Sequence, residues 1–359
     1  MTSHVSDRYN DIFVGDGEMA QMMRLHNWAE SSVGPPETWP EALKVAIRLL
    51  LTSKFEMWLG WGPDIAFFYN DAYRPTLGGK HPNALAVPTK TLWAEIWDDI
   101  KDRLETVYGT GQATWDRALL LLLERNGYSE ETYHTFSYSP LIGDSGKVEG
   151  VFCAVSEETE RVISERRLGT MRTLASGLAA ANTATEVFQA SRDALGANLQ
   201  DLPFSALYVF DALGDATREW VCGAAANHSL FPTEISLGDV WDVQSAWSKQ
   251  AVALIDLSGT DGVPSGPWPK SPTQAVVIPL TGQGVEKPRG VLICGMNPHR
   301  PVGDEYLDFL KLISGQIASR LASAHAFETE RRRATALAEA ADMRDQAAAA
   351  LEQLNRQLS

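Results

Sequence analysis

The sequence predicts an α+β chain in which two antiparallel-sheet domains are joined and followed by long helices, the last of them a coiled coil. Two series of strand-like segments, each bracketed by helical patterns, predict the sheets. A stretch without glycine or proline, from Gln316 to Ser359, predicts the final helix. That helix would be about 66 Å long at about 1.5 Å per residue. It is too long to bury its apolar positions within one domain, so it requires a partner helix.

Composition shifts and turn residues divide the chain into five segments. We expect an N-terminal arm over 1–36, a first domain over 37–156, a linking helix over 157–182, a second domain over 183–322 and a C-terminal coiled coil over 323–359.

The first domain is expected to place strands before and after a group of short helices. Asn126-Gly127 and Asp144-Ser145-Gly146 are hairpin turn sequences between its last strands. An amphipathic helix is predicted over 92–108. The expected strands are 55–61, 65–69, 114–124, 128–141 and 147–155.

The second domain begins with a capping box, Thr183-x-x-Glu186, which predicts a helix from about Thr185. A helix over about 156–181 precedes it, and another from about Asp304 leads into the tail. The expected strands are 204–211, 219–225, 252–257, 274–280 and 290–296.

The tail carries small and apolar residues three and four positions apart, interrupted by Arg344, which is the spacing of a heptad seam. These residues are Leu337, Ala340, Ala347, Leu351, Leu354 and Leu358. Ile317, Leu321 and Ala324 form an earlier stripe that is out of step with this seam. We therefore expect the seam to change phase between about Phe327 and Leu337.

Composition and charge exclude several classes of function. The chain has 359 residues and a net charge of -15, which argues against binding a nucleic-acid backbone or an anionic membrane surface. No apolar run approaches the roughly 18 residues of a membrane span. Cys153, Cys222 and Cys294 are far apart and form no CxxC pair, so a reducing cytoplasm is the expected location. The acidic pairs Glu130-Glu131 and Asp98-Asp99 are expected to be solvated.

Two groups of segments carry a likeness to known domains. The first group is Phe67 to Tyr73, Gly79 to Leu85, Tyr133 to Pro140, Gly150 to Phe152 and Glu157 to Thr159. The second group is Asp201-Leu202-Pro203-Phe204, Gly266-Pro267-Trp268-Pro269 and Arg331-Arg332-Arg333. The first group resembles the PAS domain, and the second the GAF domain, of bacterial multidomain sensor histidine kinases. The resemblance implies two sensor domains in a dimer, and it covers roughly residues 20–335.

The resemblance also implies candidate sites. A PAS-type cavity between the sheet and the short helices would be lined by Trp58, Tyr69, Asn70, Tyr73, Trp93 and Trp97. Core packing is the favoured interpretation of these side chains, and ligand binding is the alternative. Trp241, Trp247 and Trp268 border a possible GAF pocket, although a packed core explains them equally well. Glu158 and Thr159 match the acidic-x-Thr junction into a signalling helix, and with the tail leucines they are the expected relay.

No cofactor is indicated by these residues. A flavin photosensor would need a cysteine in the short helices after Asn70, and a haem domain would need a histidine on the helix 92–108; both are missing from the sequence. Cys222 and Cys294 lie within apolar strands, which argues against a bilin. His81 and His134 lack a second ligand at metal spacing, so a structural hydrogen-bonding role is expected for each.

The expected function is a sensory module that relays an unknown stimulus through dimeric helices. No His-Glu pair followed by proline and no glycine-rich nucleotide loop occurs in the sequence, so we expect no enzyme activity and a histidine kinase output outside this chain. The expected partners are a second copy in a parallel dimer, a histidine kinase or response regulator, and a small-molecule ligand. The alternative is a stand-alone dimeric scaffold that binds no ligand.

Overall fold

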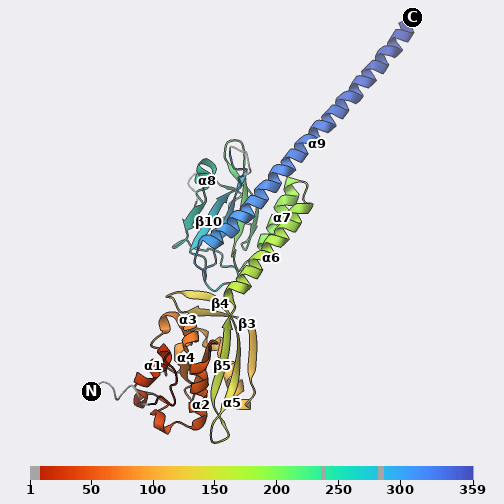
Figure 1. Ribbon diagram of the computed structural model, residues 1–359. Helices are drawn as coiled ribbons and strands as arrows, with labels where there is room; N and C mark the ends of the chain where they lie inside the picture. The colour runs from red at the N-terminus through yellow and green to blue at the C-terminus, as the bar shows by residue number, and fades with distance from the viewer. Residues whose placement is uncertain (1–8, 236–239, 282–286, 359) are drawn as a thin grey trace. The chain divides into compact units, whose positions relative to one another are not determined.

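The first sheet lies in a unit that comprises residues 1–164, and the second in a unit that comprises residues 165–359. The computed structural model describes residues 9–235, 240–281 and 287–358 (Figure 1).

Five antiparallel strands form the sheet of the first unit in the order β2-β1-β5-β4-β3. The strands are β1 (Met57–Trp61), β2 (Ala66–Tyr69), β3 (Thr114–Glu124), β4 (Ser129–Ile142) and β5 (Val148–Glu157). Gly127 and Gly146 adopt positive φ in the two hairpin turns, as their sequences predicted. The expected order of two strands, short helices and three strands is confirmed.

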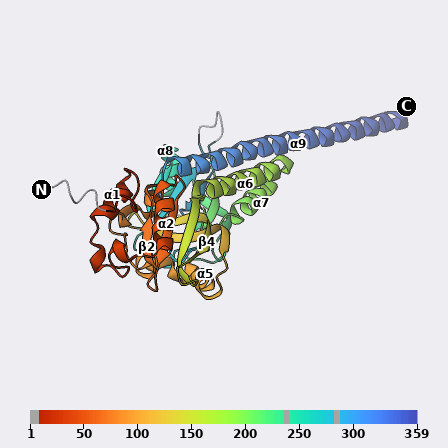
Figure 2. The same cartoon turned by 60° about the horizontal axis from the view of Figure 1, so that its bottom comes forward.

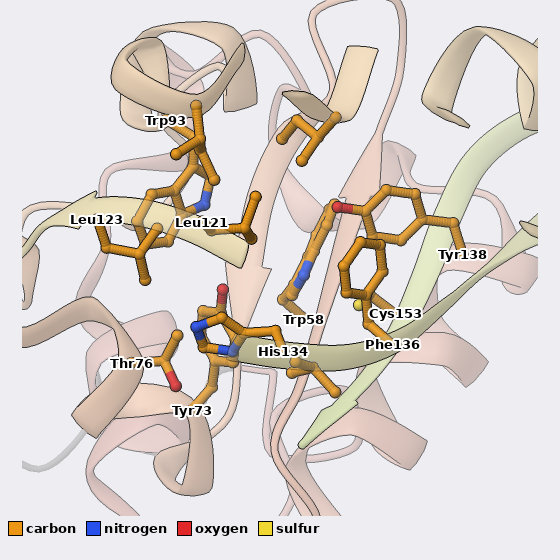
Figure 3. A pocket seen from close by; sticks show the side chains of 13 residues that line it. Trp58, Tyr73, Thr76, Trp93, Leu121, Leu123, His134, Phe136, Tyr138 and Cys153 are labelled. Carbon is orange, nitrogen blue, oxygen red and sulfur yellow. The ribbon is translucent and has the colours of Figure 1, made fainter. Parts of the chain in front are cut away.

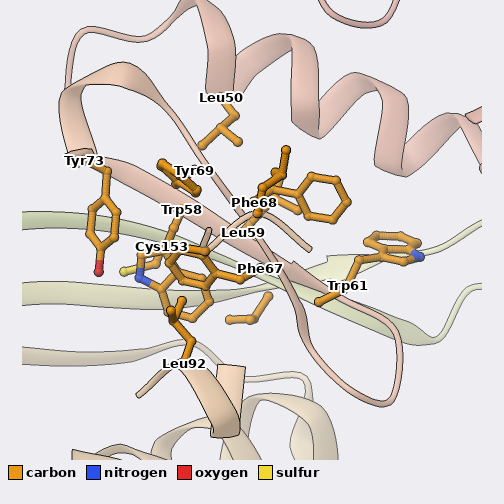
Figure 4. Packing of buried hydrophobic residues seen from close by; sticks show 14 of the residues in the cluster. Leu50, Trp58, Leu59, Trp61, Phe67, Phe68, Tyr69, Tyr73, Leu92 and Cys153 are labelled. Carbon is orange, nitrogen blue, oxygen red and sulfur yellow. The ribbon is translucent and has the colours of Figure 1, made fainter. Parts of the chain in front are cut away.

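The two faces of this sheet are covered by different segments. The short helices η3 (Asp71–Tyr73), α3 (Arg74–Leu77), η4 (Gly78–Lys80), α4 (Thr89–Leu92), η5 (Ala94–Ile96) and α5 (Trp97–Thr110) follow β2 in the chain. Phe67 packs on Trp58 and Tyr73 on their side of the sheet, whereas the adjacent Phe68 stacks on Trp28 on the other side. Figure 4 shows this alternation, with Leu50 beside Phe68 and Leu92 beside Phe67.

The N-terminal segment is thus part of the first core. It contains α1 (Glu18–Leu25), η1 (Trp28–Glu30), η2 (Pro36–Thr38) and α2 (Glu41–Thr52). Phe13, Met19, Met23 and Trp28 are buried in the same cluster as Leu43 and Phe68.

The helix expected over 92–108 is confirmed from Trp97 onward but is wrong at its start, because the backbone leaves the helical conformation at Trp93. Trp93 has φ -114° and ψ 38°, which is not helical. Lys80 Nζ lies 4.2 Å from the centre of the Trp93 ring and donates to the Leu92 carbonyl oxygen at 2.6 Å. That carbonyl is therefore satisfied by a side chain from another segment, and α5 begins only at Trp97.

Six antiparallel strands form the sheet of the second unit in the order β8-β7-β6-β11-β10-β9. They are β6 (Ser205–Phe210), β7 (Ala216–Cys222), β8 (Glu234–Ile235), β9 (Ala253–Asp256), β10 (Gln274–Pro279) and β11 (Gly290–Gly295). Neither β8 nor the helix α8 (Val243–Lys249) was expected. Both faces of this sheet are buried: Leu292 and Cys294 of β11 contribute to one core, and Val291 and Ile293 to the other.

Three helices cover one face of this second sheet and lie side by side (Figure 2). They are α6 (Thr159–Ala180), α7 (Ala184–Gly196) and α9 (Asp304–Leu358). The helix α6 starts at Thr159 and not at 156, because Ser156 and Glu157 still pair with β4. The expected capping box is confirmed, since the side chains of Thr183 and Glu186 each cap the other's backbone N–H.

Only part of the helix α9 packs in the core of the second unit. Ile317, Leu321 and Ala324 are at most 2% exposed and pack on the sheet, whereas every side chain from Thr329 to Ala348 is exposed. We expected Ile317, Leu321 and Ala324 to be an earlier part of the seam that changes phase before Leu337. They instead belong to the intramolecular core, so they are not part of a seam between helices of two chains. The helix extends as one piece to Leu358, and its coiled coil stays a prediction.

Candidate functional site

The first unit encloses a cavity between its sheet and its short helices. Strands β1, β3, β4 and β5 form one wall, and η3, α3, η5, α5 and the break at Trp93 form the other. The cavity volume is about 30 Å³, which holds no more than a few water molecules. Thirteen residues line it: Trp58, Tyr73, Thr76, Trp93, Ile96, Ile100, Leu121, Leu123, His134, Phe136, Tyr138, Cys153 and Val155 (Figure 3).

The strand register explains why these side chains meet. Cys153 of β5 is directly opposite Trp58 of β1 and Tyr138 of β4, so the three project from the same face. The rings of Trp58 and Tyr138 meet edge to face with centroids 5.4 Å apart. This wall is largely aromatic, and its polar groups are the Trp58 indole N–H, the His134 imidazole, the Tyr138 hydroxyl and the Cys153 sulfur.

The lining side chains are held in their neutral forms. Burial lowers the pKa of His134 to about 4, against the opposing charge of Glu157. Burial also raises the pKa of Tyr73, Tyr138 and Cys153 well above their ordinary values. At neutral pH the cavity therefore presents hydroxyl, thiol, indole and neutral imidazole groups.

Three of the six residues predicted for this cavity line it, namely Trp58, Tyr73 and Trp93. Tyr69 is fully buried and its hydroxyl bonds His81 Nδ1 at 2.8 Å. Asn70 organises the backbone: its side chain accepts from the Met57 and Tyr73 amides and donates to the Phe55 carbonyl. Trp97 is half-buried beneath Lys90.

Sequence reasoning missed the strand residues of the lining. His134, Phe136 and Tyr138 alternate along β4, and this period of two signals one shared face. His134 does make the structural hydrogen bond expected of it, to Thr132 Oγ1 at 3.1 Å.

A polar cluster lies where β5 passes into α6. Arg125 donates to both carboxylate oxygens of Glu157, at 2.7 and 2.9 Å, and to Glu130 at 3.0 Å. The Thr159 hydroxyl donates to Glu157 at 2.8 Å and accepts from the Tyr133 amide at 3.0 Å. Although burial opposes the shift, the bonds from Arg125 and Thr159 hold the pKa of Glu157 below its ordinary range.

This cluster shares a strand pair with the cavity, because Glu157 is directly opposite His134. It also corrects the expectation that Glu130 and Glu131 are solvated: both are buried, Glu130 against Arg125 and Glu131 against the Tyr133 hydroxyl. Asp98 and Asp99 are exposed, as expected.

The predicted relay residues fall in different surroundings. Thr159 is buried within the cluster, and the Glu158 amide donates to the Tyr133 carbonyl at 2.7 Å. The Glu158 side chain pairs with Arg161. Leu337 is 72% exposed. The side chains of Leu351, Leu354 and Leu358 lie outside the described residues.

The three tryptophans predicted for a second pocket each have a packing partner. Trp241 stacks on Phe231 and donates to the Leu230 carbonyl. Trp247 packs on Phe210, and Trp268 donates to the Gln200 carbonyl at 2.8 Å.

A second buried ion cluster fixes α6 within the second unit. The Asp201 carboxylate, which is fully buried, accepts two hydrogen bonds of 2.8 Å from Arg166 and one of 2.9 Å from Asn198. Arg167 Nε lies 3.5 Å from the same carboxylate. Although burial opposes the shift, these partners hold the pKa of Asp201 below its ordinary range.

Within the parts of the chain that the structure describes, no group of three or more His, Cys, Asp or Glu side chains is placed to hold a metal ion. No helix of residues 9–235, 240–281 and 287–358 combines the length and apolarity that a membrane crossing needs.

Comparisons with solved structures find likeness to GAF-fold proteins over part of the chain. The GAF domain of a phosphoenolpyruvate-protein phosphotransferase from Coxiella burnetii is 15% identical, with a TM-score of 0.37, covering 46% of this chain and 98% of that one. The corresponding domain from Acinetobacter is 12% identical, with a TM-score of 0.35 and coverages of 45% and 97%. The reduced form of fRMsr from Staphylococcus aureus is 16% identical, with a TM-score of 0.34 and coverages of 43% and 94%. No protein-family model and no curated relative matches the chain.

Proposed function

We propose that this chain is a cytoplasmic sensory module, with a PAS-type domain followed by a GAF-type domain, that relays the binding of a small molecule to a histidine kinase output. The first unit is the sensor, and α6 and α9 carry the signal in a parallel homodimer. The observation that supports this proposal most is that His134 of β4 and Glu157 of β5 are directly opposite each other in the sheet. His134 lines the cavity, and Glu157 holds the first residue of α6.

This geometry supports the relay. A ligand that displaces His134 or its neighbours moves β4 against β5, and Glu157 shares that strand pair. Glu157 binds Arg125 and Thr159 through side-chain bonds of defined geometry, so a shift of β5 changes the start of α6. Packed elements of this kind tend to switch between discrete arrangements. The ligand's differential affinity for the two arrangements supplies the free energy.

A pair of neighbouring leucines on β3 tests the sensor assignment. Leu121 lines the cavity, and Leu120 points to the other face. A screen of small molecules by thermal unfolding of the full chain should find stabilising compounds. Leu121→Phe should abolish their effect by filling the cavity, and Leu120→Phe should keep it. Equal responses of both variants would reject the cavity as the sensing site.

The relay has a separate test. Ligand should change hydrogen–deuterium exchange in α6 of the wild-type chain. Thr159→Val removes the hydroxyl that joins Glu157 to the Tyr133 amide, so the same ligand should bind without changing exchange in α6. An unaltered response of the Thr159→Val variant would contradict the relay.

A second candidate function is a dimeric scaffold without a ligand, and the cavity volume of about 30 Å³ favours it. Any ligand larger than a few water molecules requires lining side chains to move. Native mass spectrometry of the purified chain separates the two functions, since a stoichiometric retained small molecule excludes the scaffold.

A further inference from the structure

The outer surface of α9 carries a stripe that runs from the part of the helix packed on the second sheet into the tail, which we define as residues 329–358. From Leu337 the predicted seam continues toward the N-terminus, in alternating steps of four and three residues, to Leu312. The positions passed are Arg333, Glu330, Ala326, Ser323, Ser319 and Gln316. We call this surface, from Leu312 to Leu358, the outer stripe. It keeps one heptad phase throughout.

The outer stripe is distinct from the face of α9 that packs on the sheet. Ile317, Leu321 and Ala324 are buried in the core, whereas Ser319, Ser323 and Ala326 are exposed. Leu312 is 53% exposed although its side chain is large and apolar. Solvated helix faces are usually charged, so small and apolar residues on this exposed face indicate a contact surface.

A groove lies along the same surface between α6 and α9. Its volume is about 580 Å³, and small residues form much of its lining: Ala175 and Ala179 of α6 with Gly315, Ser319 and Ser323 of α9. Leu168, on α6, is 58% exposed. Small side chains at these spacings allow a helix to approach the backbone closely, and exposed leucines supply the knobs that enter such a groove.

We infer that the outer stripe and this groove are one dimer interface, which takes the same surface of a second copy of this chain, parallel and in register. The inference rests on the parallel dimer of the proposed function and extends its seam into the second unit. The unbroken phase favours a second copy, because a two-fold interface places each stripe position opposite itself.

One further observation agrees with a second copy as the occupant. From Leu312 to Leu358 the stripe is about 69 Å long. A contact about 10 Å wide would bury about 700 Å² per chain, close to the roughly 800 Å² per partner of a standard interface. Glu330, Arg333 and Arg344 are the charged positions of the stripe, and these three layers oppose association, whereas the small and apolar layers favour it.

Cysteine cross-linking of the full chain tests this interface. Ser323→Cys, within the second unit, and Ala340→Cys, in the tail, should both form disulfide-linked dimers under mild oxidation. Glu339→Cys is the matched control, because it is exposed beside Ala340 but lies off the stripe. The wild-type chain, whose Cys153 and Cys294 are buried and whose Cys222 is half-buried, gives the background.

The outcomes separate the inference from the proposed function. Cross-linking of Ala340→Cys without Ser323→Cys would overturn the inference and leave the tail dimer standing, with a different occupant for the groove. Failure of both, with a monomeric mass in solution, would reject the parallel dimer itself. Equal cross-linking of Glu339→Cys and Ala340→Cys would show random collision and would also overturn the inference.

Discussion

His134 is kept neutral inside the first unit, and acid should therefore weaken that unit. Its pKa in the folded chain is about 4, against 6.5 for an unperturbed histidine. Above pH 6.5 the ring is neutral in both states. Between pH 6.5 and 4 the unfolded chain binds a proton that the folded chain excludes, so stability falls as the pH falls. The full effect is about 3 kcal/mol.

Protonation of Glu157 and Asp201, whose pKa values are lowered, also destabilises the folded chain in acid. A variant is therefore needed to isolate the contribution of His134. His134→Gln keeps a polar partner for Thr132 and cannot take up this proton. The unfolding free energy of wild type should fall more steeply below pH 6.5 than that of His134→Gln in urea titrations. Parallel pH profiles would contradict the buried neutral ring.

Asp201 is the residue on which α6 depends within the second unit. Asp201→Asn leaves the half-buried Arg166 and Arg167 guanidinium groups without their counter-charge, so a loss of about 3 kcal/mol is expected. Asp308→Asn is the control, because Asp308 forms an exposed pair with Lys311, and exposed pairs contribute little to stability. Thermal unfolding of the two variants compares them, and equal losses would show that the buried cluster has no special role.

At the scale of elements, α9 offers a test of phase. One residue inserted after Thr335 rotates the tail by about 100° relative to the second unit, so the two halves of the outer stripe cannot pair together. Seven inserted residues restore the phase. In the Ser323→Cys and Ala340→Cys backgrounds, the short insertion should reduce cross-linking at one or both sites, and the long one should restore it. Full cross-linking at both sites after the short insertion would exclude a continuous stripe.

Local patterns predicted most of the strands, because alternation and turn sequences such as Asn126-Gly127 act over a few residues. They failed where distant groups decide the structure. Lys80 donates a hydrogen bond to the Leu92 carbonyl at the end of α4, and Arg125 forms an ion pair with the buried Glu130. The stripe that contains Ile317 and the stripe that contains Ser319 have the same helical period, so the sequence alone could not show which of the two faces the core. Only three of the thirteen residues that line the cavity were predicted. Trp58 was recognisable as an aromatic side chain with a polar group, whereas placing His134 required the strand register.

For the whole molecule, the net charge of -15 on each chain causes electrostatic repulsion between two copies. The outer stripe itself is mainly small and uncharged, so added salt should screen the repulsion without removing the attraction. We expect the dissociation constant of the dimer to fall or stay constant between about 0.1 and about 0.5 M salt. Sedimentation at a series of concentrations measures it. A marked rise would show that ion pairs, and not the apolar stripe, hold the copies together.

The helix α6 also determines where the chain can be divided. Thr159 completes the polar cluster of the first fold, and Arg166, seven residues later, anchors the second. A fragment that began at Glu165 would place Arg166 in a fresh helix end, where the first backbone N–H groups have no acceptors and the turn frays. The second fold therefore needs sequence that the first also uses. The boundary between the two is a shared stretch of helix and not a point, so any exchange of one domain for another must carry residues 159–166 with both.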